Sequence, residues 1–198
     1  MDLSKYKGLI FDMDGTLLDT MPYHVKAWET AAEQFEFPFN GEWLHSMGGM
    51  PSNKVVEKIN DLTGKQLVPE EVVKVKQDAF DALGCKGEKI ALTCDIVDAY
   101  FGKLPMAVGT GSQRDNALLL LKNAGITEKF HAIVTASDVE QHKPNPDTFL
   151  LAAKKMNVLA ESCVVFEDTE LGKQAAHAAR MDCILVEGNE LKLYPYNK

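Results

Sequence analysis

The chain has 198 residues, 45% of them hydrophobic and 25% charged, which is typical of a folded globular protein and excludes a disordered chain or a collagen-like fibre. No stretch approaches the roughly 18 consecutive apolar residues of a membrane span, and the N-terminus lacks the pattern of a signal or transit peptide. We therefore expect a cytoplasmic protein with no membrane partner. The net charge of −8, with Arg114 and Arg180 as the only arginines, argues against nucleic acid as a partner.

Short apolar runs predict buried strands along the chain. Each run is a few residues long and apolar throughout, as in strands that are covered on both faces of a parallel sheet. Helical patterns follow the second, third and fourth runs, and alternating strands and helices predict an α/β fold, a Rossmann-like doubly wound parallel sheet. The predicted strands are residues 8–11, 106–109, 132–135, 163–166 and 183–186, and these predicted helices are residues 115–123, 147–156 and 170–179.

The interval between the first and second predicted strands is about ninety residues, which is far too long for one crossover connection. It holds helical patterns and no convincing strand, so we predict a helical domain inserted after the first strand. A further helix then leads back into the sheet. The expected division is a catalytic core of residues 1–16 and 87–198 and a helical domain of residues 17–86, with helices at 23–35, 52–62, 69–83 and 92–101.

The strongest chemical signal is a pair of acids, Asp12 and Asp14, directly after the first predicted strand. Open α/β sheets bind ligands at the carboxyl ends of their strands, and Gly15 allows the chain to turn away there. Two neighbouring carboxylates repel each other unless a cation or a proton lies between them, so a divalent ion with oxygen ligands fits this motif. The alternative is an ordinary acidic turn after a strand.

Polar groups also follow the next three predicted strands. Each group has an ordinary structural reading: a helix N-cap, a solvated lysine, and acids that favour a helix N-terminus. Together they supply a hydroxyl with free backbone N–H groups, an ammonium and an acid pair, which are the groups that one magnesium–phosphate site needs. These groups are Thr110, Gly111 and Ser112, then Lys143, then Glu167 and Asp168.

The cysteines show no metal-binding or redox spacing. Cys163 and Cys183 open apolar runs and are expected to be small buried core residues. For Cys85 and Cys94 we also expect a structural role rather than metal binding or redox chemistry.

The motifs Asp12-x-Asp14-Gly15-Thr16, Thr110-Gly111-Ser112, Lys143 and Glu167-Asp168 resemble those of the haloacid dehalogenase superfamily of phosphotransferases, over essentially the whole chain. Within it, Tyr23-His24-x-x-Ala27-Trp28 resembles the beta-phosphoglucomutase-like subgroup, which also holds phosphatases of small sugar phosphates. Residues 105–112 and the segment around His142 look most like those phosphatases, of the fructose 1-phosphate and 6-phosphogluconate type.

The resemblance implies a Mg²⁺-dependent phosphatase acting on a small phosphorylated sugar. Asp12 would be the nucleophile that forms an aspartyl-phosphate, and Asp14 would be the general acid and base. Thr110, Gly111, Ser112 and Lys143 would hold the phosphoryl group, and Thr16 would help to orient Asp14. Mg²⁺ would be held by Asp12, the backbone carbonyl of Asp14, and Asp168, with Glu167 as a ligand or as a partner of one.

In this resemblance the helical domain is a cap that chooses the substrate. The segment 48–52, with Gly49 and Ser52, resembles the substrate-specificity loop, although it would also serve as a simple turn between helices. His24 lies on the same helix face as Trp28, which is expected in the cap core, and it is placed to reach the cleft. Lys54 and Lys76 are candidates for a sugar hydroxyl or a distal charge, although helical lysines are more often solvated.

Two alternatives stay open at this point. A sugar-phosphate mutase must clamp a second phosphate, for which the resembling mutases use a cap arginine, and residues 17–86 contain none; Lys54 or Lys76 would have to substitute. A non-catalytic Mg²⁺- and phosphate-binding regulator would use the same pocket, although both Asp12 and Asp14 are intact. We expect a monomer or a weak dimer.

Two features depart from the resembling pattern or stay without an interpretation. Arg180 stands where the family pattern usually has glycine, which concerns the geometry of a helix end rather than the chemistry. The tail 191–198 matches no recognisable motif, and it either packs on the core or mediates association.

Overall fold

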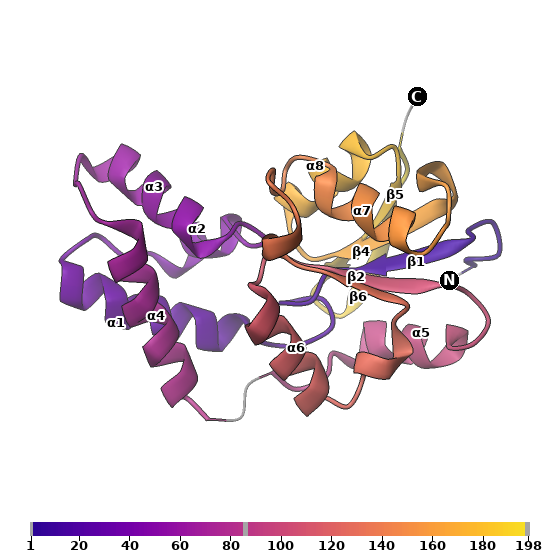
Figure 1. Ribbon diagram of the computed structural model, residues 1–198, viewed down its shortest axis with the longest axis horizontal. Coiled ribbons are helices and arrows are strands. Elements are labelled where there is room, and N and C mark those ends of the chain that lie inside the picture. The colour runs from indigo at the N-terminus through magenta and orange to yellow at the C-terminus, as the bar shows by residue number, and fades with distance from the viewer. Residues whose placement is uncertain (1, 85–86, 197–198) are drawn as a thin grey trace.

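The computed structural model describes residues 2–84 and 87–196 and contains one six-stranded sheet with the order β3-β2-β1-β4-β5-β6. The first five strands are parallel, and β6 pairs antiparallel with β5 at the edge (Figure 1). The predicted α/β fold is therefore confirmed, with the parallel prediction wrong only for this edge strand. The strands are β1 (Gly8–Phe11), β2 (Met106–Gly109), β3 (Ala132–Val134), β4 (Cys163–Glu167), β5 (Asp182–Glu187) and β6 (Glu190–Tyr194).

Helices cover both faces of the sheet because successive strand residues point to opposite sides. Leu9 and Phe11 lie in one buried cluster with α5 and α6, whereas Ile10 lies in the other with α7 and α8. Phe11 also stacks on Phe166 of β4, with ring centroids 4.6 Å apart. These covering helices, which Figure 1 shows on opposite sides of the sheet, are α5 (Ala91–Tyr100), α6 (Arg114–Asn123), α7 (Asp147–Lys155) and α8 (Glu170–Ala178).

The chain order of the strands fixes where a ligand can bind. From β1 the chain leads to β2 and β3 on one side, and it then crosses to β4 and β5 on the other. The carboxyl ends of β1 and β4 therefore flank the point at which the strand order reverses, which is the usual binding crevice of such sheets. Asp12 follows β1, and Glu167 ends β4.

The segment between β1 and α5 forms a helical lobe beside the sheet, on the left in Figure 1. Its helices share a hydrophobic cluster of their own that includes Trp28, Val56, Ile59 and Val72. The structure describes no strand between residues 17 and 84, where the only β pairing is two isolated bridges at Leu18, to Asp14 and to Lys89. The helices are α1 (Met21–Phe35), α2 (Gly41–Ser46), α3 (Ser52–Thr63) and α4 (Pro69–Ala82); α2 was not predicted because six residues are too few to show a helical period.

The tail 191–198, for which the sequence predicted no secondary structure, begins within β6. Gly188 and Asn189 form the two-residue turn from β5, with Gly188 at φ +60°, and a Gly-Asn pair between strands is a hairpin signal that the sequence analysis overlooked. Beyond the strand, the Tyr196 N–H donates to Asp182. The tail therefore packs on the core, as one of the two expectations had it; residues 197–198 lie outside the described part.

The described cysteines are buried and free, so their expected core role is confirmed for Cys94, Cys163 and Cys183. Burial raises the pKa of each of these three thiols. Cys85 lies outside the described residues. Within the part of the chain that the structure describes, no helix is long and apolar enough to cross a membrane.

Arg180 has φ +61°, so the helix end after α8 does adopt the left-handed conformation in which glycine is usual. Its side chain is exposed and contributes little packing. We therefore expect Arg180→Gly to raise the free energy of unfolding by about 1 kcal/mol, since it removes the steric cost of a side chain in this region. Chemical denaturation measures this change, and a fall in stability would show that the arginine side chain outweighs the strain.

Candidate active site

The turn after β1 brings its two acids to the crevice. The Asp12 N–H donates to the Phe166 carbonyl at 2.9 Å, so the residue still follows the strand pairing. Gly15 then has φ +88°, and a Cβ atom there would lie 2.2 Å from Asp168 Oδ2. Glycine is therefore required both by the backbone conformation and by the carboxylate that lies against it.

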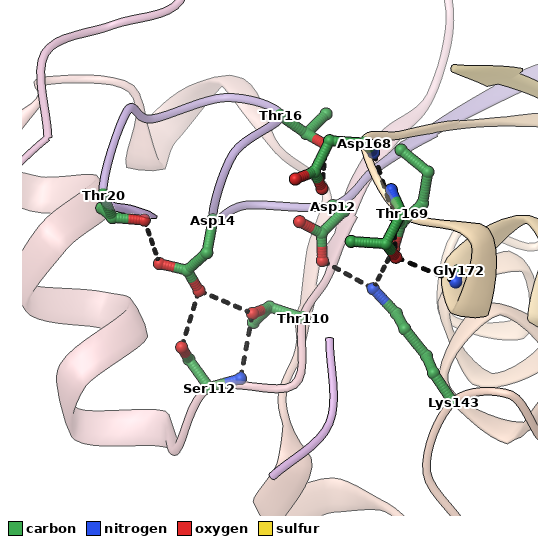
Figure 2. A network of polar contacts seen from close by, with 11 residues as sticks. Asp12, Asp14, Thr16, Thr20, Thr110, Ser112, Lys143, Asp168, Thr169 and Gly172 are labelled. Atoms are coloured by element: carbon green, nitrogen blue, oxygen red, sulfur yellow. Dashed lines mark hydrogen bonds and ion pairs between the residues drawn. The ribbon is translucent and has the colours of Figure 1, made fainter. Parts of the chain in front are cut away.

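Lys143 lies between two buried acids, as Figure 2 shows for Asp12. Its Nζ atom is 2.6 Å from Asp12 Oδ1 and 2.6 Å from Glu167 Oε1, and no side chain of the three is more than 4% exposed. Burial by itself would lower the pKa of Lys143, but the two carboxylates raise it above its usual value. Burial raises the pKa of Asp12, whereas Lys143 lowers it. The lysine is therefore a fixed cation next to Asp12.

The start of α8 holds Glu167 in place. Its Oε2 accepts hydrogen bonds from the backbone N–H groups of Asp168 and Thr169 and from the Thr169 hydroxyl, each at 2.9 Å. A Cβ atom at Gly172 would lie 1.8 Å from the Glu167 carboxyl carbon, so that glycine makes room for the acid. Both oxygens of Glu167 are thus engaged by the protein itself.

Asp14 is surrounded by donors, three of which are drawn in Figure 2. The hydroxyls of Thr20 and Ser112 donate to it at 2.7 Å, the Thr110 hydroxyl lies at 3.4 Å, and His24 Nε2 lies at 3.3 Å. Burial by itself would raise the pKa of Asp14, but His24 and the Ser112 and Thr20 hydroxyls lower it below its usual value. The surroundings of Asp14 therefore favour its ionised form.

His24 connects Asp14 to the helical lobe. Its Nδ1 lies 3.1 Å from Lys76 Nζ, and its ring stacks on Phe80 with centroids 4.4 Å apart. Lys76 is 4% exposed, and burial lowers its pKa to about 8. The expectation that this lysine is solvated is therefore wrong, because the packing of α4 against α1 turns its side chain inward.

Asp168 has one carboxylate oxygen that no hydrogen bond engages. Its Oδ1 accepts from the Thr16 hydroxyl at 3.3 Å, whereas its Oδ2 is buried without a hydrogen-bond partner. Burial, and then the neighbouring Glu167, raise the pKa of Asp168 to about 8. Thr16 was expected to orient Asp14; it contacts Asp168 instead, and Thr20, which the sequence analysis missed, contacts Asp14.

A cavity of about 150 Å³ lies between these acids and the helical lobe. The other walls are mainly apolar side chains of the lobe, including Met47 and Trp28. Lys54 does not reach the cavity: it is half exposed, pairs with Glu57 and lines a separate groove. Thr16, Lys143, Glu167 and Asp168 are not among the residues that line the cavity. The predicted residues that line it are Asp12, Asp14, His24, Gly49, Ser52, Lys76, Thr110, Gly111 and Ser112.

Sequence reasoning missed several residues of this site. Thr20 and Thr169 supply hydroxyls to Asp14 and Glu167, and Met47 lines the cavity. Thr169 carried a usable signal, since a threonine before a helix is a common N-cap, and it does accept from the Gly172 N–H. Thr20 and Met47 carried none, because their positions depend on how the lobe packs against the sheet.

Comparison with known proteins identifies the family. The sequence pattern of the haloacid dehalogenase-like hydrolases matches residues 9–186. The chain belongs to that family. It is 40% identical over 180 residues to the fructose-1-phosphate phosphatase YqaB of Escherichia coli, covering 91% of this chain and 96% of that protein. It is 30% identical over 187 residues to beta-phosphoglucomutase of Bacillus subtilis, covering 88% of this chain and 80% of that protein.

Solved structures agree with this assignment. A hydrolase from Pseudomonas syringae superposes with a TM-score of 0.82 at 26% identity, covering 89% of this chain and 83% of that one. The recognised subgroup is therefore confirmed, and this member of the haloacid dehalogenase-like hydrolases is an enzyme of the phosphatase class.

The ion pairs of Lys143 give a stability prediction. Lys143→Met would leave two buried acids without their cation, and we expect it to lower the free energy of unfolding by about 3 to 5 kcal/mol at neutral pH. Urea denaturation measures this loss. Lys103→Met, at an exposed position, is the matched control and should stay within about 0.5 kcal/mol of the wild type.

Adding Glu167→Gln to Lys143→Met removes one of the two uncompensated acids, so the double variant should recover part of the lost stability. A Lys143→Met protein as stable as its control would contradict the structural role of the lysine.

Proposed function

We propose that this protein is a Mg²⁺-dependent phosphatase that hydrolyses small sugar monophosphates, similar to fructose 1-phosphate, through an aspartyl-phosphate on Asp12. The proposal rests on one observation: Asp12 and Asp14 line the same cavity but have different surroundings. Asp12 is held by a fixed ammonium, which suits a nucleophile that must meet a phosphate. Asp14 is surrounded by donors and connected to the lobe, which suits an acid and base.

In the first step an Asp12 carboxylate oxygen attacks phosphorus, and the bond from phosphorus to the sugar oxygen breaks. The leaving oxygen takes a proton from Asp14. The Ser112 and Thr110 hydroxyls donate to Asp14 in the free enzyme, and a bound phosphoryl group offers them stronger acceptors. Loss of these two donors raises the pKa of Asp14, so substrate binding favours its protonated form.

In the second step water attacks phosphorus and gives its proton to Asp14, and the bond from phosphorus to Asp12 breaks. Inorganic phosphate and the free Asp12 carboxylate result. Lys143 stays charged throughout and balances the negative charge on the phosphoryl oxygens. His24, held by Lys76 and Phe80, keeps Asp14 in the position that both proton transfers need.

The residues present fit a magnesium ion. Asp168 Oδ2 is a buried carboxylate oxygen that lacks a partner, which is the environment that a cation relieves. Within residues 2–84 and 87–196 no three acidic, imidazole or thiol side chains form a metal site by themselves. That agrees with Mg²⁺, which uses one or two carboxylates and completes its shell with phosphate, carbonyl and water oxygens.

We propose Asp12, Asp168 and the Asp14 carbonyl as the protein ligands. Glu167 instead positions Lys143, because its own oxygens are engaged. Mg²⁺, when bound, would neutralise charge between Asp12 and the phosphate and favour the ionised carboxylates.

The lobe supports a monophosphate substrate. We propose residues 17–86 as a cap over the cavity. A mutase would need a second phosphate clamp, and the cap contains no arginine. Arg114 is the arginine nearest the motifs, but it is held by Asp138 at 2.5 and 2.7 Å.

The nucleophile is tested by phosphate release with Mg²⁺ from a panel of monophosphates that includes fructose 1-phosphate, 6-phosphogluconate and glucose 6-phosphate. We expect steady release by the wild type and none by Asp12→Asn, since an amide cannot form the acyl phosphate. Asp95→Asn, at an exposed position, is the control and should match the wild type. Residual turnover by Asp12→Asn would refute the nucleophile.

The same panel tests the mutase. If no phosphate is released, beta-glucose 1-phosphate with a bisphosphate primer is supplied. Glucose 6-phosphate would then identify a mutase and overturn the proposed phosphatase.

The metal site is tested by thermal unfolding with and without Mg²⁺. Because the pKa of Asp168 is raised to about 8, far above the unfolded value of about 3.9, metal-free stability should fall as pH rises between these values. Protons compete with the metal over the same range, so the rise in Tm caused by Mg²⁺ should grow as pH increases through about 8.

Asp168→Asn should remove most of that Mg²⁺-dependent rise in Tm, whereas Asp95→Asn should keep it. An equal Mg²⁺ effect in both variants would contradict the assignment of Asp168 as a ligand.

A further inference from the structure

The loop between α2 and α3 touches the loop after β2 through backbone atoms. Gly49 lies in a turn closed by a hydrogen bond from the Met50 N–H to the Met47 carbonyl, and it has φ +83°. A Cβ atom at Gly111 would lie 2.2 Å from the Gly49 oxygen, 2.7 Å from its carbonyl carbon and 3.3 Å from its Cα. The three nearest atoms to that position all belong to Gly49.

The requirement for glycine at position 111 comes from this contact alone. Unlike Gly15 and Gly49, Gly111 does not have a positive φ, so its backbone conformation does not by itself require glycine. A side chain at position 111 is therefore compatible with the core loop and incompatible with the lobe in its observed place.

The same turn also covers the fixed cation. A Cβ atom at Gly49 would lie 3.0 Å from Lys143 Cδ and 3.7 Å from its Nζ. Lys143 is 2% exposed and Asp12 3% exposed. The backbone of the turn thus lies directly over the ion pair, where any larger residue would press on the lysine.

The position of the lobe matters for chemistry because it carries two groups that reach toward Asp14. His24 on α1 contacts Asp14, and Lys76 on α4 contacts His24. If the lobe stood farther from the sheet, His24 would move away from Asp14 with it. A contact that fixes the position of the lobe against the sheet therefore also fixes the contact between His24 and Asp14.

We propose that Gly111 is a positioning residue on which the cap closes: its missing side chain lets the Gly49 turn settle over the phosphoryl site. This inference rests on the proposed phosphatase function. A methyl group at position 111 props the cap open by contact with the Gly49 carbonyl, and it leaves the Gly111 N–H and the core loop in place.

The test compares Gly111→Ala with Gly41→Ala. Gly41 lies in the cap at the start of α2, has no positive φ, and an added Cβ would meet only Val25 at 3.6 Å. Two substrates are used with Mg²⁺. Fructose 1-phosphate needs a proton on its leaving oxygen and carries a sugar large enough to contact the cap, whereas acetyl phosphate has a small leaving group that needs no proton.

We expect Gly111→Ala to lower kcat/KM for fructose 1-phosphate by roughly a hundredfold, as misplacement by about 1 Å does, and to lower that for acetyl phosphate far less. Gly41→Ala should match the wild type with both. Equal losses for the two substrates in Gly111→Ala would place its role in the phosphoryl site itself and overturn the inference.

A second readout follows the cap directly. Trp28 and Trp43 are the only tryptophans, and Trp28 is 4% exposed and lines the cavity. In a Trp43→Phe background, acrylamide quenching of Trp28 should increase with Gly111→Ala and stay constant with Gly41→Ala. Unchanged quenching in Gly111→Ala would refute a propped cap.

The two proposals fail differently. If the wild type hydrolyses neither of these substrates nor any monophosphate of the panel, the proposed function is wrong. If it hydrolyses both and Gly111→Ala behaves like Gly41→Ala, only the role of Gly111 is wrong.

Discussion

The buried ammonium of Lys143 is the constraint on which the site depends. It joins Asp12, at the end of β1, to Glu167, at the end of β4, and it comes from a loop that follows β3. Each of these charges alone would cost several kcal/mol to bury, and together they offset one another. The three chain segments are therefore held in register by the same groups that, in the proposed function, would surround a reacting phosphate, so stability and the proposed chemistry would share one set of contacts.

The charge count around Lys143 explains why a cation fits. One ammonium faces Asp12 and Glu167, and Asp168 adds a third acid whose Oδ2 has no partner. Without further positive charge, the pKa values of Asp12 and Asp168 rise, because burial and their neighbours disfavour ionisation. The pKa of Asp14 is instead lowered, because His24 and the Ser112 and Thr20 hydroxyls contact its carboxylate. The site thus separates the proposed nucleophile, which needs a cation, from the proposed acid and base, which does not.

The sequence predicted the sheet and the four motifs because both are local signals. A buried strand is a short apolar run, and an acid at its carboxyl end needs only its position in the chain to be placed at the crevice. Lys76 and Thr20 could not be predicted in this way. A lysine on a polar helix is solvated unless another helix covers it, and only the packing of α1 against α4 turns Lys76 toward His24. The β6 hairpin could have been predicted from Gly188-Asn189.

At the site the helical lobe contacts the sheet domain in two different ways, in addition to the hydrophobic cluster that Ala27 and Phe80 share with the strands. His24 reaches Asp14 by a polar contact, whereas the backbone of Gly49 packs closely against the backbone of Gly111 and the side chain of Lys143. A polar contact at 3.3 Å tolerates small displacements but weakens steeply when the geometry is lost. Backbone packing resists approach and fixes the distance. In the proposed role, the packing contact therefore sets where the lobe stops, and the polar contact uses that position to hold Asp14. Two glycines without functional side chains would thus control the geometry of the proposed acid and base.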